Sequence, residues 1–309
     1  MIRRLLLAAL ALAMIMPAGQ AAAEGGLTVS PASTEVIINP GVDQVEFDIT
    51  VTNNDPVTVT ARLQAVNFKA LDENGGVAFA GLENDEVETK YSLSSWLGFS
   101  KDVVTLEPGK SETIKAYIDN RDSLSPGGHY GAVIVTPLNP DSGGDKNQVE
   151  IVPATAALVL AKKIGGESYG MQLDYISFER SMLGLPKKAD LRFQNTGNIH
   201  VVPRGTITIY GPNGQAVQKA LINTDSGVVL PETFRKYEND FMSLSRAFWP
   251  GRYRAEIAWR YDGQADFTIT EVYLWHSGWG VWLLGLIIAA IVIVLWITRS
   301  KRGKKTAKP

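Results

Sequence analysis

A run of 20 residues without a charge, Gly278 to Ile297, lies close to the C-terminus. At about 1.5 Å rise per residue, a helix of this length spans about 30 Å, the thickness of a bilayer's hydrocarbon core. Trp279 and Trp282 lie near one end of the run and Trp296 near the other, as aromatic residues do at the two membrane interfaces. The run therefore predicts a single transmembrane helix rather than a buried core helix.

Basic residues follow the run directly, beginning with Arg299, Lys301 and Arg302. Basic flanks of a span stay on the cytoplasmic side. The tail 299–309 is therefore expected in the cytoplasm and the body of the chain outside it, as in a single-pass type I membrane protein. A tail of 11 residues is too short for an enzyme or an output domain.

The N-terminus has the pattern of a secretory signal over residues 1–23. Arg3 and Arg4 precede a 12-residue apolar run, Leu5 to Met16, and Ala21-Ala22-Ala23 supplies small residues for cleavage. The alternative, a first transmembrane helix, needs a longer run. Glu24 is the expected first residue of the mature chain.

Composition excludes several classes of site. The chain has no cysteine, so disulfides, thiol catalysis and cysteine-ligated metals are excluded, and its three histidines, His129, His200 and His276, are far apart. Eight of the 30 basic residues lie in the two ends, and all 32 acidic residues lie between them. An acidic body of this kind argues against nucleic-acid binding.

Residues between the two ends predict an all-β body. Apolar and polar residues alternate in Val45–Val51, Thr113–Ile118 and Thr206–Tyr210, with turn residues between such segments. This period of two indicates antiparallel sandwiches. No amphipathic helix of 12 or more residues is evident between the signal and the apolar run.

Three sequence patterns recur in the same order in the two halves of the body. They are an Asn-rich turn after a strand (47–56 and 189–198), a strand entering a Leu and Pro turn (103–119 and 227–240), and a Pro-Gly turn before an aromatic strand (125–136 and 248–259). Tyr130 and Tyr253 follow the two Pro-Gly turns, and we expect both to be structural, with a buried ring and a hydroxyl bonded to backbone. The repeat predicts two tandem immunoglobulin-like β-sandwiches followed by a single transmembrane α-helix.

The repeat also suggests domain limits. They are a signal peptide (1–23), a first domain (24–166), a second domain (167–272), a juxtamembrane segment and helix (273–298) and a basic tail (299–309). The strand at 151–164 is assigned to the first domain. That domain carries an insertion, which we place within 69–98.

Four segments of the first domain support a family resemblance: LTVSPASTEVIINPG (27–41), FDITVTNND (47–55), YSLSSWLGFSKDVVTLEPGKSETIKAYI (91–118) and SPGGHYGAVIV (125–135). With these segments, the domain resembles the N-terminal domain of the WxL-interacting proteins of bacterial cell surfaces. The resemblance implies peptidoglycan binding by the first domain and binding of a host or surface partner by the second.

The first domain is also similar to the immunoglobulin-like domain of periplasmic pilus chaperones, which use basic residues in a cleft to hold a carboxylate. The opening strand here, Leu27 to Ile38, contains no Arg or Lys.

Catalytic signatures are missing from the sequence. It contains no HExxH pattern and no phosphate-loop pattern, and its one GxSxG match, GESYG (166–170), lies in a Gly-rich segment that we expect to be a turn. Two acidic loops, Asp72–Gly75 and Asp141–Asp145, do not complete a calcium-binding pattern, and we expect them to be solvated. The chain is therefore expected not to be an enzyme and to need no cofactor or metal.

Two aromatic groups are candidate contacts for a ligand or partner. Trp96 and Phe99 either plug the first sandwich or form a platform for a glycan or a protein. Phe241, Phe248 and Trp249 either cap the second sandwich or form a protein interface. Exposed edge strands offer a third route, the addition of a partner's strand.

These features predict a non-catalytic cell-surface protein that binds cell-wall polymer (peptidoglycan) or surface proteins. The alternatives are a chaperone-like assembly factor that donates or accepts a strand, and an accessory subunit of an envelope complex. An exposed edge in the first domain beside a basic cleft would favour the assembly factor.

Overall fold

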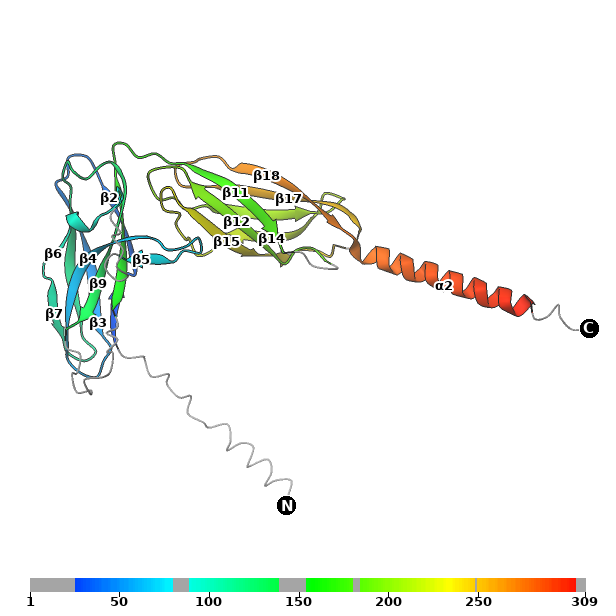
Figure 1. The fold of residues 1–309 in the computed structure, drawn as a ribbon, viewed down its shortest axis with the longest axis horizontal. Coiled ribbons are helices and arrows are strands. Elements are labelled where there is room, and N and C mark those ends of the chain that lie inside the picture. Colours follow the sequence, from blue (N-terminus) through cyan, green and yellow to red (C-terminus); the bar gives the residue numbers. More distant parts are fainter. Residues whose placement is uncertain (1–25, 80–88, 139–153, 180–183, 248, 304–309) are drawn as a thin grey trace, which may run out of the picture.

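The structure is a computed structural model that describes residues 26–303, apart from 80–88, 139–153, 180–183 and 248. Strands make up most of it, and one long helix follows them at the C-terminus (Figure 1). The prediction of an all-β body with one C-terminal helix is confirmed. The predicted signal peptide lies outside the described residues.

The N-terminal strands form two sheets. One has the order β1-β3-β8-β6, and the other has the order β2-β10-β9-β4-β5, with β7 also pairing with β4. The opening segment of the chain therefore contributes β1 to one sheet and β2 to the other, as in immunoglobulin-type sandwiches. The strands are β1 (Leu27–Ser30), β2 (Ser33–Ile38), β3 (Gln44–Asn53), β4 (Val59–Ala70), β5 (Val77–Phe79), β6 (Leu97–Phe99), β7 (Val103–Leu106), β8 (Ser111–Asp119), β9 (Gly127–Pro137) and β10 (Thr155–Lys163), with a 3₁₀ turn η1 at Ser94–Trp96.

The C-terminal strands form a second pair of sheets, with the orders β11-β12-β15 and β16-β14-β13-β17-β18. Strand β10 belongs with the N-terminal sheets, since it pairs with β9 and β2. The C-terminal strands are β11 (Met171–Phe178), β12 (Lys188–Asn195), β13 (Arg204–Tyr210), β14 (Ala216–Ile222), β15 (Phe234–Asp240), β16 (Met242–Ser243), β17 (Gly251–Arg260) and β18 (Thr268–His276).

Each sheet pair encloses its own hydrophobic cluster. Alternate residues of β12 and β17 are buried, which is the period of two that the sequence shows. Strand β9 differs, because residues 127–135 are all buried. One face of β9 packs into the N-terminal cluster through Val133 and Val135, and the other contacts the C-terminal sheets through Tyr130.

The first repeated pattern is built around a fully buried asparagine, Asn53. Its Nδ2 donates to the carbonyl oxygens of Val57 (2.8 Å) and Leu106 (2.9 Å), and its Oδ1 accepts from the N–H of Asp55 (2.9 Å). The side chain thereby connects the turn after β3 to the strand β7, which contains the second repeated pattern.

Asn195 does the same in the C-terminal sheets, and it is also fully buried. Its Nδ2 donates to the carbonyls of Ile199 (2.7 Å) and Val229 (2.8 Å), and its Oδ1 accepts from the N–H of Gly197 (2.9 Å). The repeat in the sequence therefore corresponds to a repeated hydrogen-bonding arrangement.

The third repeated pattern places a glycine in the left-handed half of backbone space. Gly127 has φ of 122° and Gly251 has φ of 148°, values that L side chains rarely adopt. Both glycines follow a proline and begin a strand, β9 or β17, as the Pro-Gly turn chemistry predicts.

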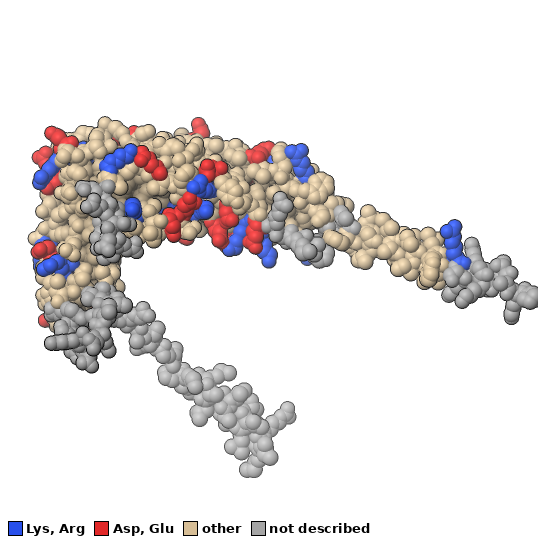
Figure 2. Space-filling model, in the orientation of Figure 1, with Lys and Arg blue, Asp and Glu red and all other residues tan. Residues whose placement is uncertain are grey.

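Helix α2 (Gly278–Gly303) extends from the far end of the C-terminal sheets (Figure 1). Within it, Trp282–Arg299 has a mean hydropathy of 2.3 and no part of this window is buried. The space-filling view shows no charged residue along most of the helix (Figure 2). Helix α2 is long and apolar enough to cross a membrane.

Candidate functional site

Trp96 and Phe99, the predicted contacts of the first half, are half-buried and pack against the N-terminal cluster. The Trp96 Nε1 donates to Ser123 Oγ at 3.3 Å, and its ring lies 6.2 Å from that of His129. Trp96 thus combines the two interpretations, since it supports the core and keeps part of its surface exposed.

Two of the predicted contacts of the second half, Phe241 and Trp249, differ in their exposure. The Phe241 ring stacks on Phe178 with centroids 6.3 Å apart and packs against the C-terminal cluster. Trp249 is 64% exposed. Phe248 lies outside the described residues.

The predicted membrane anchors all lie in α2. Trp282 and Trp296 are exposed, at 58% and 72%, and Arg299 is exposed beyond them. Trp279, Lys301 and Arg302 belong to the helix, and their side chains lie outside the described part of the structure.

The two repeated tyrosines have different partners, which corrects one expectation. The Tyr253 hydroxyl donates to the backbone carbonyl of Trp249 at 2.8 Å, as predicted. The Tyr130 hydroxyl instead lies 3.2 Å from Nδ1 of His200, a residue of the C-terminal half. Tyr130 therefore joins the two sheet pairs rather than its own corner.

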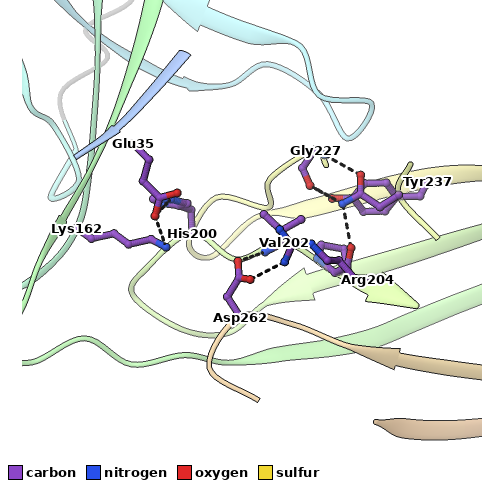
Figure 3. Close-up of polar contacts among 10 residues, drawn as sticks. Glu35, Lys162, His200, Val202, Arg204, Gly227, Tyr237 and Asp262 are labelled. Atoms are coloured by element: carbon purple, nitrogen blue, oxygen red, sulfur yellow. Dashed lines mark hydrogen bonds and ion pairs between the residues drawn. The ribbon is translucent and has the colours of Figure 1, made fainter. Parts of the chain in front are cut away.

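His200 and Lys162 are buried and lie with the exposed Glu35 in a polar cluster between the halves (Figure 3). Lys162 Nζ is 2.5 Å from Glu35 Oε1, and the His200 Nε2 is 3.7 Å from the same oxygen. The imidazole and the ammonium lower the pKa of Glu35 to about 2, against the opposite effect of burial. Burial lowers the pKa of His200, so the imidazole is neutral at pH 7.

The loop Asp72–Gly75, expected to be solvated, reaches the C-terminal sheets instead. The β4–β5 hairpin that carries it extends across to them (Figure 1). Glu73 accepts two hydrogen bonds from the Arg192 guanidinium, at 2.6 and 2.9 Å, and lies 3.4 Å from Lys236 Nζ. Arg192 and Lys236 lower the pKa of Glu73 to about 2. This loop is a second joint between the halves.

A small cavity of about 230 Å³ lies between these two joints. Its walls are mostly apolar, with Phe68 and Leu158 from the N-terminal sheets and Val228 from the C-terminal half. Arg235 also lines it and donates through Nη1 to the Val228 carbonyl at 2.8 Å. Arg235, which lines the cavity, therefore already has a partner within the chain, as Lys162 of the neighbouring polar cluster has in Glu35.

Strand β10 has no free edge. Strand β2 pairs with it in parallel over six residues, Ser33 to Ile38, and buries Val36 and Ile38 in the N-terminal cluster. Strand β2 rather than β10 is therefore the edge of this sheet, and the opening segment that contains β2 carries no Arg or Lys.

Strand β18 holds the place of β10 in the C-terminal sheets but lacks the covering strand. Within the part of the chain that the structure describes, β18 pairs with β17 alone. Strand β11, the first of the C-terminal strands, pairs only with β12. The two sheets are therefore open along the side where β11 and β18 are edges.

The open side contains a groove of about 510 Å³. Ile176 and Phe178 of β11 and Val272 and Leu274 of β18 line it, and all four pack as half-buried residues against the C-terminal cluster. Leu185, from the segment before β12, completes the apolar lining.

The free edge of β18 has few of the features that protect edge strands. Such edges are usually short or interrupted by charge, proline or bulges. Strand β18 has nine residues, TITEVYLWH, with Glu271 as its only acidic or basic side chain apart from His276. This edge and its groove form the candidate functional site, which we call the β18 groove.

Sequence patterns did not reveal the β18 groove. Alternation predicts β18 as a strand, but whether an edge is covered depends on pairing between distant segments. In the structure, the first half of the repeat begins with two short strands, β1 and β2, whereas the second begins with one, β11.

No metal centre is formed by the described residues, since no group of three or more His, Asp or Glu side chains lies together among them. His129 is buried with its ring nitrogens 2.7 Å from the Ser125 carbonyl and 3.1 Å from the Ser92 carbonyl. His276 lies 3.1 Å through Nε2 from the Ala247 carbonyl. Each histidine thus has a structural contact.

No protein-family model and no curated protein sequence matches this chain. Among solved structures, the chain is similar to a class 5 fimbriae chaperone, CfaA, with 11% identity and a TM-score of 0.41 over 80% of this chain and 98% of that one. It is similar to the E. coli chaperone DraB, with 12% identity and a TM-score of 0.37 over 80% and 98%.

A protein of unknown function from Porphyromonas gingivalis is similar at 14% identity and a TM-score of 0.32, over 80% of this chain and 98% of that one. TM-scores below 0.5 carry no argument about function.

Proposed function

We propose that this protein is a non-catalytic binding protein of the bacterial cell envelope, held at the membrane by α2, that accepts an extended segment of a partner protein in the β18 groove. This is the assembly-factor or accessory-subunit alternative, with the strand accepted by the second half of the chain. The observation that carries it is the unpaired edge of β18 beside a groove into which both sheets contribute apolar side chains.

The N-terminal half provides a template for the occupant. Strand β2 lies on β10, bonds to it along the backbone, and inserts Val36 and Ile38 between the sheets. A partner segment on β18 would do the same, with backbone bonds for affinity and alternate apolar side chains for specificity. The expected occupant is thus an extended segment of about six residues with apolar residues at every second position.

A protein partner is favoured over the wall polymer by the placement of the aromatic candidates. Trp96 and Phe99 pack against the N-terminal cluster, so only part of each ring is exposed for stacking on a sugar. Peptidoglycan binding then depends only on the resemblance to the WxL-interacting proteins.

The test is photo-crosslinking of the full-length protein in membranes of its source cell. A photoreactive amino acid replaces Thr270, which is half-buried on the groove side of β18. We expect crosslinks to a defined partner segment with alternating apolar residues, identified by mass spectrometry. Leu274→Lys should abolish them, because it places a charge in the groove.

Ile269→Lys is the matched control, because Ile269 is on the same strand but points outward and is 61% exposed. It should leave the crosslinks unchanged. Near-UV circular dichroism checks folding, and Val272→Lys replaces Leu274→Lys if that variant unfolds. Crosslinks that survive both groove variants would exclude the β18 groove. Retention of the protein on peptidoglycan sacculi, unaffected by these variants, would instead favour the wall polymer.

A further inference from the structure

We propose that the end of the C-terminal sheets next to α2 is a lipid-binding surface that rests on the headgroups of an anionic membrane. The surface consists of Leu244, Arg246, Trp249, Arg252 and Trp275, and we call it the membrane-facing end. The inference depends on the membrane anchor of the proposed function and adds to it a folded contact with the lipid.

The connection between sheet and helix is too short for the two to separate. Strand β18 ends at His276 and α2 begins at Gly278, so Ser277 alone lies between them. One residue spans at most about 3.6 Å. Gly251 of β17 pairs with His276, and so the sheet itself, not only its last strand, is held at the base of the helix.

Large apolar side chains are exposed at this end. Trp275 is 79% exposed, Trp249 64% and Leu244 54%. The loop that carries Leu244 and Trp249 is attached to the strands, since Leu244 N–H donates to the Val217 carbonyl at 2.8 Å. Exposed Trp and Leu side chains held by the sheet are suited to the boundary between headgroups and acyl chains.

The cations at this end complement an anionic surface. Arg246 and Arg252 have no carboxylate within 4.0 Å among the described side chains, whereas Arg254, further from the helix, is 2.6 Å from Glu271. The Arg252 guanidinium lies 3.7 Å from the Tyr273 ring centroid, which leaves its charge available. Basic side chains near anionic lipid add to the attraction that buried apolar surface provides.

This contact would set the orientation of the β18 groove. A helix with a flexible linker would let the sheets tumble above the bilayer. A sheet end that rests on headgroups instead holds β18 upright, with its free edge starting at the membrane surface. The groove would then be presented to segments that emerge close to the bilayer.

Site-specific labelling tests the inference, because the chain has no cysteine of its own. The full-length protein is placed in nanodiscs of phosphatidylcholine and phosphatidylglycerol, and a fluorophore is attached to Leu244→Cys. Leu221→Cys is the matched control, on the other end of the same sheet and 48% exposed. Ile288→Cys, in α2, reports the span. The nanodiscs of each labelled variant contain lipids that carry a quencher either at the headgroup or in the acyl chain.

We expect headgroup quenching of the Leu244 label to be at least about twofold stronger than that of the Leu221 label. Arg246→Glu should weaken it in anionic nanodiscs. Acyl-chain quenching of the Ile288 label, with equal headgroup quenching of the two sheet labels, would overturn the lipid-binding surface and leave the anchor intact. Absence of quenching at Ile288 would overturn the anchor, and the inference with it.

Discussion

The Tyr130 hydroxyl and the Nδ1 of His200, 3.2 Å apart, form a buried hydrogen bond between the two halves of the chain. Tyr130 is 2% exposed and His200 is 1% exposed. Strand β9 carries the tyrosine, and the turn after β12 carries the histidine. A polar contact with no access to water at this position defines how the halves meet.

We expect Tyr130→Phe to destabilise the protein by about 1–3 kcal/mol, because it leaves a buried His200 nitrogen without a partner. The free energy of unfolding in urea measures the loss. Distances between spin labels on engineered cysteines, one in each half, should also broaden.

Tyr253→Phe is the control, because Tyr253 bonds only within its own half, to the Trp249 carbonyl. It should leave the label distances unchanged. If both substitutions broaden the distances equally, the Tyr130–His200 contact does not determine the arrangement of the halves.

The repeated asparagines give a second prediction. Asn53→Ala and Asn195→Ala each leave three backbone groups without their partner, so we expect losses of about 3 kcal/mol or more in unfolding free energy. Asn54→Ala should cost much less, because the Asn54 side chain is exposed and bonds only to Thr28 Oγ1. Similar costs for Asn53 and Asn54 would contradict the structural role of the repeat.

The Glu73 loop should respond to salt. Glu73→Gln removes the ion pair with Arg192, and we expect it to increase the spread of label distances between the halves at low ionic strength. The change in unfolding free energy should stay below about 1 kcal/mol, since the pair is partly solvated. Glu107→Gln is the control, because Glu107 is exposed and no ion pair of the described residues involves it. High salt should screen the ion pair in the native protein and increase its spread of label distances toward that of the variant.

Buried histidines predict how stability changes with pH. Burial lowers the pKa of His129 and of His200 in the folded protein. The unfolded chain, with histidine pKa values near about 6.5, then binds protons that the folded protein does not. Stability should therefore fall as the pH drops below about 6.5, as unfolding midpoints between pH 7.5 and 5 would show.

Glu35 and Glu73 do not contribute in that range. Their pKa values of about 2 are lower than in the unfolded chain, so the stability they add is lost only as the pH falls from about 4.5 toward 2. NMR titration of the His129 and His200 rings would check the assignment. Ring pKa values at or above 6.5 would contradict it.

The local pattern of apolar and polar residues is enough to predict the strands, the helix and the repeat. The alternation of Thr206–Tyr210 predicts strand β13, and the charge-free run predicts α2, because both depend on the spacing of apolar residues along a short segment. The Asn-rich turns at Asn53 and Asn195 were recognised as equivalent, and their hydrogen bonds are the same.

The local sequence pattern does not predict the contacts between distant segments. Tyr130 and Tyr253 occupy equivalent places in the repeat, yet only Tyr253 bonds to its own corner. Likewise, the sequence predicts a solvated acidic loop at Glu73, because it does not show that Arg192, 119 residues later, lies beside that loop.

The amino-acid sequence by itself determined the all-β body, the repeat and the C-terminal helix, since strand and helix periodicity are local properties. Only the tertiary structure decided that β2 covers β10 while β18 stays open, and that Tyr130 meets His200. Strand pairing and side-chain contact depend on which distant surfaces are brought together, and equivalent residues in a repeat acquire different partners when their surroundings differ.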